Sequence, residues 1–275
     1  MKRIYHPNKG HRETPDMAAI EADELLRQVD LCFVMDATGS MGSYIAEARK
    51  ELKSFAHQLS THKLNPRMAF ALVLYRDHPP QDSTFVTQCH QLSENLDEVQ
   101  RHLDRASAEG GGDGPEAVAD GLYDALYTME WRQGSHKVIL LAGDAPPHGA
   151  GMDGDGFPRG CPCGHDPLTV AREAQEKGIT IFALGIGTDS TMRRSFEQIS
   201  GAGGGIYVPL NNASALIDRV LTITVAEFGK VDIDRTVYRA YRPKITASEI
   251  ARTTGLSLKE VEESLLRLRK KEMLH

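Results

Sequence analysis

The sequence has few cysteines and no long apolar run. Its 275 residues include four cysteines, too few for the disulfide framework of a small secreted domain. No stretch approaches the roughly 20 consecutive apolar residues that a membrane-spanning helix needs. The first residues, MKRIYHPNKGHRETPD, lack the apolar core of a signal peptide. We therefore expect a cytoplasmic protein that makes no contact with a membrane.

Neither sign of charge dominates the chain. It has 32 basic and 38 acidic residues, which gives a net charge of −6. This balance excludes a strongly basic protein that binds nucleic acid through its overall positive charge. The chain is long enough for one large core, or for one domain with a small appendage, and it contains neither repeats nor low-complexity segments.

Apolar runs that resemble buried strands alternate with segments of helical periodicity. Such alternation predicts an α/β fold with a mostly parallel sheet covered by helices on both faces. The run 84–90 alternates polar and apolar residues, as an edge strand does. The expected strands are 31–36, 68–75, 84–90, 137–144, 179–187 and 205–210.

Composition divides the chain into four parts. Residues 1–28 form an N-terminal extension with a short helix, and residues 29–228 form the α/β domain. Residues 229–242 are polar with scattered apolar positions and are interpreted as a linker. Residues 243–275 contain two helical patterns joined by TTGLS, which predicts a small all-α helix-turn-helix module.

Oxygen-bearing side chains follow two of the predicted strands. Asp36 and Asp144 end apolar runs, and Thr38 and Ser40 follow Asp36 at every second position. Asp113 lies in the glycine-rich stretch EGGGDGPE. Because the carboxyl ends of parallel strands meet at one edge of a sheet, we expect these five side chains to converge. An all-oxygen ligand set suits Mg²⁺, Mn²⁺ or Ca²⁺.

Two other interpretations of the stretch DATGS compete with a metal site. A phosphate-binding loop is disfavoured, because no lysine follows the glycines. A helix cap formed by Thr38 or Ser40 is the simpler alternative. The second aspartate-terminated strand and the glycine-rich loop favour metal coordination over capping.

Asp36-Ala37-Thr38-Gly39-Ser40 resembles the DxSxS loop, often DxTxS, of von Willebrand factor A (vWA) domains. The resemblance covers residues 29–228 and includes the late segment EQISGAGGGIYVPL. It implies a Rossmann-like, doubly wound sheet with a metal-ion-dependent adhesion site (MIDAS) at its top.

The resemblance also implies a ligand set, in which the first loop contributes Asp36, Thr38 and Ser40. Asp144 comes from the motif after the fourth strand, and Asp113 stands where the family usually has a threonine. This variant is similar to vWA domains found with alpha-kinases and in bacteria. The added carboxylate favours firm metal binding but weakens attraction for the acidic side chain of a partner.

The expected function is therefore a non-enzymatic module that binds a divalent metal and another protein. An acidic side chain of the partner is one candidate for the contact with the metal. Metal-dependent phosphoester hydrolysis is an alternative, because one hard cation can activate water. The sequence does not indicate a nucleophile with an oriented base, which favours the binding function.

A long loop after the fourth buried strand carries a second set of ligands. Its members are His148, Cys161, Cys163 and His165, and together they could hold zinc. The CxCxH spacing is also compatible with a redox-active cysteine pair or with reduced thiols in a turn. The nearby DGDG at 153–156 is interpreted as an acidic loop rather than a calcium site.

The C-terminal helices resemble a helix-turn-helix of the winged-helix type, which implies DNA binding and suggests a DNA-associated transcriptional regulator. Glu260, Glu262 and Glu263 at the start of the second helix would repel phosphates. A docking or dimerisation role is equally compatible. The basic residues that would contact DNA are Arg267, Arg269, Lys270 and Lys271.

Overall fold

The computed structural model describes residues 17–112 and 114–274. Within these residues, six strands form one sheet in the order β3-β2-β1-β4-β5-β6. All neighbouring pairs are parallel except β2 and β3, so the predicted α/β fold is confirmed. The strands are β1 (Gln28–Asp36), β2 (Arg67–Tyr75), β3 (Thr87–Ser93), β4 (His136–Gly143), β5 (Ile179–Ile186) and β6 (Gly204–Leu210).

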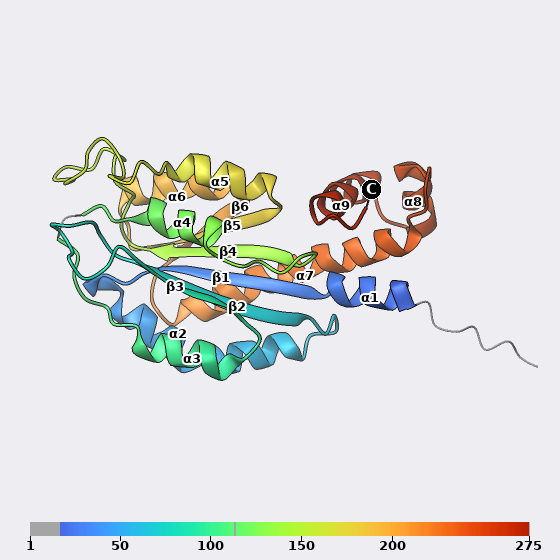
Figure 1. Cartoon of the computed structure of the whole chain (residues 1–275), viewed down its shortest axis with the longest axis horizontal. Helices are drawn as coiled ribbons and strands as arrows, with labels where there is room; N and C mark the ends of the chain where they lie inside the picture. Colours follow the sequence, from blue (N-terminus) through green and yellow to red (C-terminus); the bar gives the residue numbers. More distant parts are fainter. Residues whose placement is uncertain (1–16, 113, 275) are drawn as a thin grey trace, which may run out of the picture.

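Helices cover both faces of this sheet (Figure 1). Side chains of α2, α3 and α7 share one apolar core with the sheet, and those of α4, α5 and α6 share the other. The near-continuous apolar sequences of β1, β2, β4 and β5 follow from burial on both faces. The helices are α1 (Met17–Leu26), the short η1 (Gly39–Met41), α2 (Gly42–Ser60), α3 (Leu96–Arg105), α4 (Val118–Tyr127), α5 (Pro167–Glu176), α6 (Ser190–Ala202), α7 (Ala215–Ala240), α8 (Ala247–Thr254) and α9 (Leu258–Lys270).

The strand order reverses between β1 and β4, which lie side by side at the centre of the sheet. Chain connections leave these two strands in opposite directions, so a crevice opens beyond their carboxyl ends. Asp36 is the last residue of β1, and Asp144 directly follows β4. The topology therefore places the two predicted metal ligands at the edge where α/β folds bind ligands.

The prediction of a linker at 229–242 is wrong, because α7 runs unbroken from Ala215 to Ala240. Phe228 and Val231 pack in the core shared with the sheet. Val237, two turns further along the helix, packs in a separate small core with α1 and the C-terminal helices. Burial at both ends of one helix explains why a segment with scattered apolar residues is helical.

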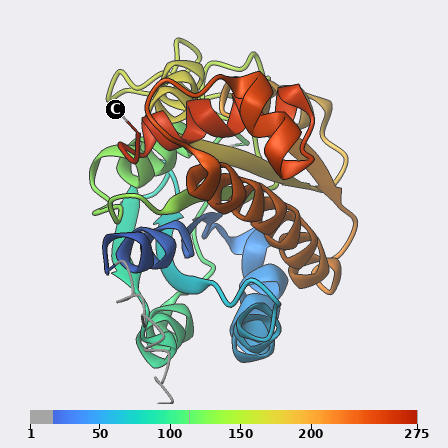
Figure 2. The same cartoon turned by 90° about the vertical axis from the view of Figure 1, so that its right-hand side faces the viewer.

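Each of the two C-terminal helices begins at a capping box. Thr246 caps α8 and Ser257 caps α9, each in a complete capping box with a glutamate three residues later, and Gly255 ends α8 in the left-handed conformation. Both helices pack against α7, with α1 nearby (Figure 2). They lie at the end of the molecule opposite the loops that follow the strands (Figure 1). None of the described helices has the length and apolarity to cross a membrane.

Candidate functional site

The loop after β1 is organised by its own aspartate. Thr38 donates two hydrogen bonds to Oδ1 of Asp36, from Oγ1 at 2.7 Å and from the backbone N–H at 2.8 Å. Oγ of Ser40 lies 3.4 Å from Oγ1 of Thr38. Thr38 makes no side-chain capping bond to η1, and α2 is preceded by Met41. The capping interpretation is therefore wrong, and the hydroxyls lie beside the carboxylate.

Asp36 is fully buried, and its environment disfavours its negative charge. Burial raises the pKa of Asp36 to about 7, and the neighbouring carboxylate of Asp144 adds to this rise, whereas the hydrogen bonds from Thr38 oppose it. Oδ2 of Asp36 has no hydrogen-bond partner within 17–112 and 114–274. A bound cation would satisfy this oxygen and offset the repulsion between the two carboxylates. The donor set thus fits a divalent metal.

The glycine-rich loop that precedes α4 lies alongside the loop after β1. Gly39 donates to the carbonyl of Gly110 at 3.3 Å, and Glu109 donates to the carbonyl of Ala37 at 3.1 Å. Gly111 has a φ of +88°, a conformation that glycine adopts without steric cost. Asp113, the ligand predicted from this loop, lies outside the described residues.

Sequence reasoning missed Glu116, a buried residue that lines the same pocket as Asp144. Helix α4 begins only at Val118, so Glu116 lies in the loop before it. The N–H of Glu116 donates instead to the carbonyl of Pro146 at 2.9 Å, so this residue bridges the loops before α4 and after β4. The sequence feature that could have identified Glu116 is its position three residues after Asp113, at the end of the same glycine-rich stretch.

These loops enclose an open pocket with a volume of about 300 Å³. Ser40 is exposed and Asp144 half-buried, whereas Asp36 and Thr38 are buried beneath them. A cation in the pocket would therefore be held from below and remain reachable from solvent. The lining residues are Thr38, Gly39, Ser40, Gly110, Gly111, Gly114, Glu116, Asp144 and Ala145.

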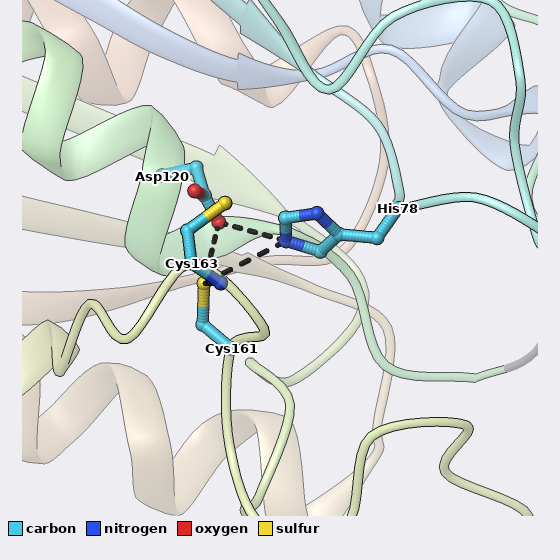
Figure 3. Close-up of side chains that lie close together, drawn as sticks. All are labelled: His78, Asp120, Cys161 and Cys163. Carbon is cyan, nitrogen blue, oxygen red and sulfur yellow. Dashed lines mark hydrogen bonds and ion pairs between the residues drawn. The ribbon is translucent and has the colours of Figure 1, made fainter.

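A second cluster of potential metal ligands gathers near the start of α4 (Figure 3). It comprises His78, Asp120, Cys161 and Cys163, whose ligand atoms all lie within 4.8 Å of one another. Oδ2 of Asp120 is 3.0 Å from Nε2 of His78 and 3.0 Å from Sγ of Cys161. Burial lowers the pKa of His78, but the hydrogen bonds to Asp120 and Cys161 outweigh this effect and raise it to about 9.

This cluster corrects the ligand set predicted from the loop sequence. His148 is not a member, because its Nε2 lies 2.7 Å from Asp77 and its Nδ1 lies 2.8 Å from Asp155. His165 contacts the cluster at Asp120, with Nδ1 at 3.1 Å from Oδ1. His78 and Asp120 were missed because they are 42 residues apart and far from both cysteines in sequence.

The basic residues predicted to contact DNA are largely engaged within the protein. Arg267 and Lys271 both form ion pairs with the buried Asp234 of α7. Lys270 donates to the backbone carbonyl of Gln175, and Arg269 is exposed. The predicted basic cluster therefore serves mainly to dock α9, and its geometry does not favour the DNA-binding interpretation.

Comparison with known proteins agrees with this geometry. The family model described as von Willebrand factor type A domain matches residues 30–219. Alpha-protein kinase vwkA of Dictyostelium discoideum is 33% identical over 148 residues, which cover 53% of this chain and 23% of the kinase. The chain thus corresponds to about a quarter of that relative.

Solved structures share the fold at low sequence identity. The pilus adhesin SpaC of Lactobacillus rhamnosus GG in its open conformation gives a TM-score of 0.53 at 17% identity, covering 74% of this chain and 30% of SpaC. Proximal thread matrix protein 1 of the mussel byssus, solved with zinc in its MIDAS motif, gives a TM-score of 0.51 at 16% identity. That match covers 72% of this chain and 46% of the matrix protein.

Proposed function

Because the chain belongs to the von Willebrand factor type A domain family, we propose that it is a non-enzymatic module that binds another protein through a divalent metal ion. The ion sits in the pocket at the carboxyl ends of β1 and β4. The observation that carries this proposal is the buried Oδ2 of Asp36, which has no hydrogen-bond partner in the described chain and lies beside the Asp144 carboxylate.

The proposed ligands, bound directly or through water, combine two aspartates with two hydroxyl groups. Asp36, Thr38 and Ser40 act from the loop after β1, and Asp144 acts from the loop after β4. Such oxygen ligands favour Mg²⁺, Mn²⁺ or Ca²⁺. Zinc in the MIDAS motif of the mussel matrix protein supports metal occupancy at the corresponding edge of this fold, and Asp113 is a further proposed ligand.

The openness of the pocket supports a role in binding rather than in storing the ion. Ser40 is exposed, so a partner's oxygen atom can complete the coordination of the metal. The carboxylates of Asp36, Glu116 and Asp144 already exceed the two positive charges of the proposed ion, before Asp113 is added. We therefore propose that a neutral carbonyl or hydroxyl oxygen of the partner competes well with an acidic side chain for the open position.

Titration with Mg²⁺ and Mn²⁺, followed by calorimetry, tests the metal site. The Asp36→Asn variant keeps an oxygen that accepts the hydrogen bonds from Thr38 but removes the buried charge. We expect it to lose cation binding while its metal-free form unfolds at a temperature no lower than that of the metal-free wild type. The matched control is Asp153→Asn, since Asp153 is an exposed acid in the loop after β4. Equal cation affinity in Asp36→Asn and wild type would refute the site.

Partner binding is tested by capture on the immobilised chain in Mg²⁺, with identification of the captured protein. A metal-bridged partner is released by EDTA and does not bind to Asp36→Asn. Ser40→Ala is expected to weaken its binding without unfolding the domain, because Ser40 lies at the exposed mouth of the pocket. A partner that binds equally well in EDTA and to Asp36→Asn would contradict the metal-bridged mode.

A further inference from the structure

We propose that His78, Asp120, Cys161 and Cys163 form a zinc site, separate from the carboxylate pocket, that fixes the long loop between β4 and α5. The four residues come from three different segments. His78 follows β2, Asp120 lies in the first turns of α4, and both cysteines belong to the loop itself. This inference does not depend on the proposed function of the carboxylate pocket.

The chemistry of the ligands selects zinc over the hard cations. Two soft thiolates, one borderline imidazole and one hard carboxylate make a mixed set, which suits tetrahedral Zn²⁺ and is poor for Mg²⁺ or Ca²⁺. Binding would release the thiol protons of Cys161 and Cys163 as the metal–sulfur bonds form. The sum of two thiolates and one carboxylate leaves the occupied site with one negative charge.

The ligand atoms lie near the spacing that tetrahedral zinc requires. Zinc–sulfur bonds of about 2.3 Å and zinc–nitrogen bonds of about 2.0–2.1 Å place tetrahedral ligand atoms about 3.3–3.8 Å apart. Sγ of Cys161 lies 3.6 Å from Nε2 of His78. Each of these two atoms lies 3.0 Å from Oδ2 of Asp120. Small outward movements would admit the ion. Figure 3 shows the imidazole and the two sulfur atoms converging on the Asp120 carboxylate.

His165 supports the site from behind. Its Nδ1 lies 3.1 Å from Oδ1 of Asp120, so the carboxylate is held with Oδ2 toward the other ligands. The His165 ring stacks on Tyr123 at a centroid distance of 3.8 Å, with the planes 6° apart. Partners that orient a ligand in this way accompany most protein metal sites. His165 is therefore a positioning residue and not a ligand.

The zinc would add metal–ligand bonds to the part of the loop that carries the two cysteines. The loop begins at Asp144, in the wall of the carboxylate pocket, and its first half is held by the bonds of His148 to Asp77 and Asp155. Cys163 is exposed and Cys161 half-buried, so the turn around them lies at the surface. Zinc binding would link this turn to α4 and to the segment after β2, and so stabilise the rim of the pocket.

Metal analysis of the purified chain, with Co²⁺ substitution, tests the proposal. We expect one zinc ion per chain, and a Co²⁺ form with the visible bands of tetrahedral coordination and thiolate charge-transfer absorption. Cys161→Ser and Cys163→Ser should each lose the zinc and the charge-transfer band. Cys89→Ser should retain both, since Cys89 lies on β3. His165→Ala should weaken the affinity by about 10- to 100-fold without abolishing it.

Asp36→Asn separates this site from zinc bound in the carboxylate pocket, because it should leave the thiolate absorption unchanged. In the wild type, zinc should slow maleimide labelling of Cys161 and lower amide exchange in residues 149–164. Zinc retained in both serine variants, or lost only in Asp36→Asn, would overturn the proposal. A metal-free chain whose two cysteines are joined in a disulfide would overturn it equally.

Discussion

Asp234 of α7 and Lys271, which directly follows α9, form an ion pair inside the protein. Nζ of Lys271 lies 3.1 Å from Oδ2 of Asp234, and the two side chains are 6% and 0% exposed. Arg267 and Ser264 of α9 donate to the other oxygen, Oδ1. One carboxylate on α7 thus holds three side chains of the C-terminal module and fixes where α9 docks.

Asp234→Asn should loosen this docking, because it leaves the buried Lys271 without its counter-charge. Removing one partner of a buried ion pair costs about 3–5 kcal/mol. We expect faster amide exchange in α8 and α9 while the sheet keeps its protection. Asp232→Asn is the matched control on the same helix, since the Asp232 side chain is 58% exposed. Equal exchange in the two variants would show that the ion pair does not hold the module.

Docking of α9 should also weaken in acid. Burial raises the pKa of Asp234, but Lys271 and Arg267 outweigh it and hold the pKa below its ordinary value of 3.8. The stabilisation is therefore complete above the unfolded-state pKa and is lost as the pH falls through the lower folded-state pKa. Amide exchange in α9, followed as the pH falls below 3.8, should rise in the wild type. The Asp234→Asn variant should lack this rise in amide exchange at low pH. An identical pH profile in both proteins would contradict the role of Asp234.

Glu116→Gln tests the acidic residue that sequence reasoning missed. The substitution preserves the size of the side chain but removes a negative charge from the wall of the carboxylate pocket. We expect a loss of Mn²⁺ affinity of about 10- to 100-fold, the usual effect of changing a group that surrounds a metal. Calorimetric titration measures it, with Glu109→Gln as the control in the same loop. Unchanged affinity would place Glu116 outside the electrostatic influence of the ion.

Gly111→Ala separates backbone strain from damage to the pocket. Gly111 has a φ of +88°, and an added Cβ would lie 3.3 Å from Oε1 of Glu116 and 3.3 Å from Cβ of Thr38. Gly151 has a similar φ of +85° but nothing within 4 Å of an added Cβ. Alanine at either position should cost about 1–2 kcal/mol of backbone strain, whereas only Gly111→Ala should lower cation affinity. Chemical unfolding measures the loss of stability, and Mn²⁺ titration measures the cation affinity. Equal affinities of the Gly111→Ala and Gly151→Ala variants would show that the added Cβ at position 111 does not disturb the pocket.

Mobility-shift assays test the engagement of the basic residues of α9. Because Arg267 and Lys271 are paired with Asp234, too few free positive charges remain on this helix to hold the phosphate backbone. We expect no shift of duplex DNA at low salt, and no difference between the wild type and Arg269→Ala. A shift that Arg269→Ala abolishes would restore the DNA-binding hypothesis.

Local patterns were sufficient to predict most elements of the fold. The runs that end at Asp36 and just before Asp144 were predicted as strands because they are almost continuously apolar. This composition is typical of strands that are buried on both faces of a sheet. The capping boxes at Thr246 and Ser257 are local features as well, because each side chain and the backbone it caps are three residues apart. The stretch 229–240 was misread because its few apolar residues pack in two different cores, which no local pattern reveals.

The sequence by itself determined the loop after β1, since Asp36, Thr38 and Ser40 are close in the chain and their contacts follow from their spacing. Only the tertiary structure brought Glu116 beside Asp144, and His78 and Asp120 beside Cys161. These pairs come from segments joined by long connections, and their proximity depends on how strands and helices pack at the edge of the sheet. Packing over such distances is decided by the whole core, so the carboxylate pocket was foreseeable in outline and the composition of the cysteine cluster was not.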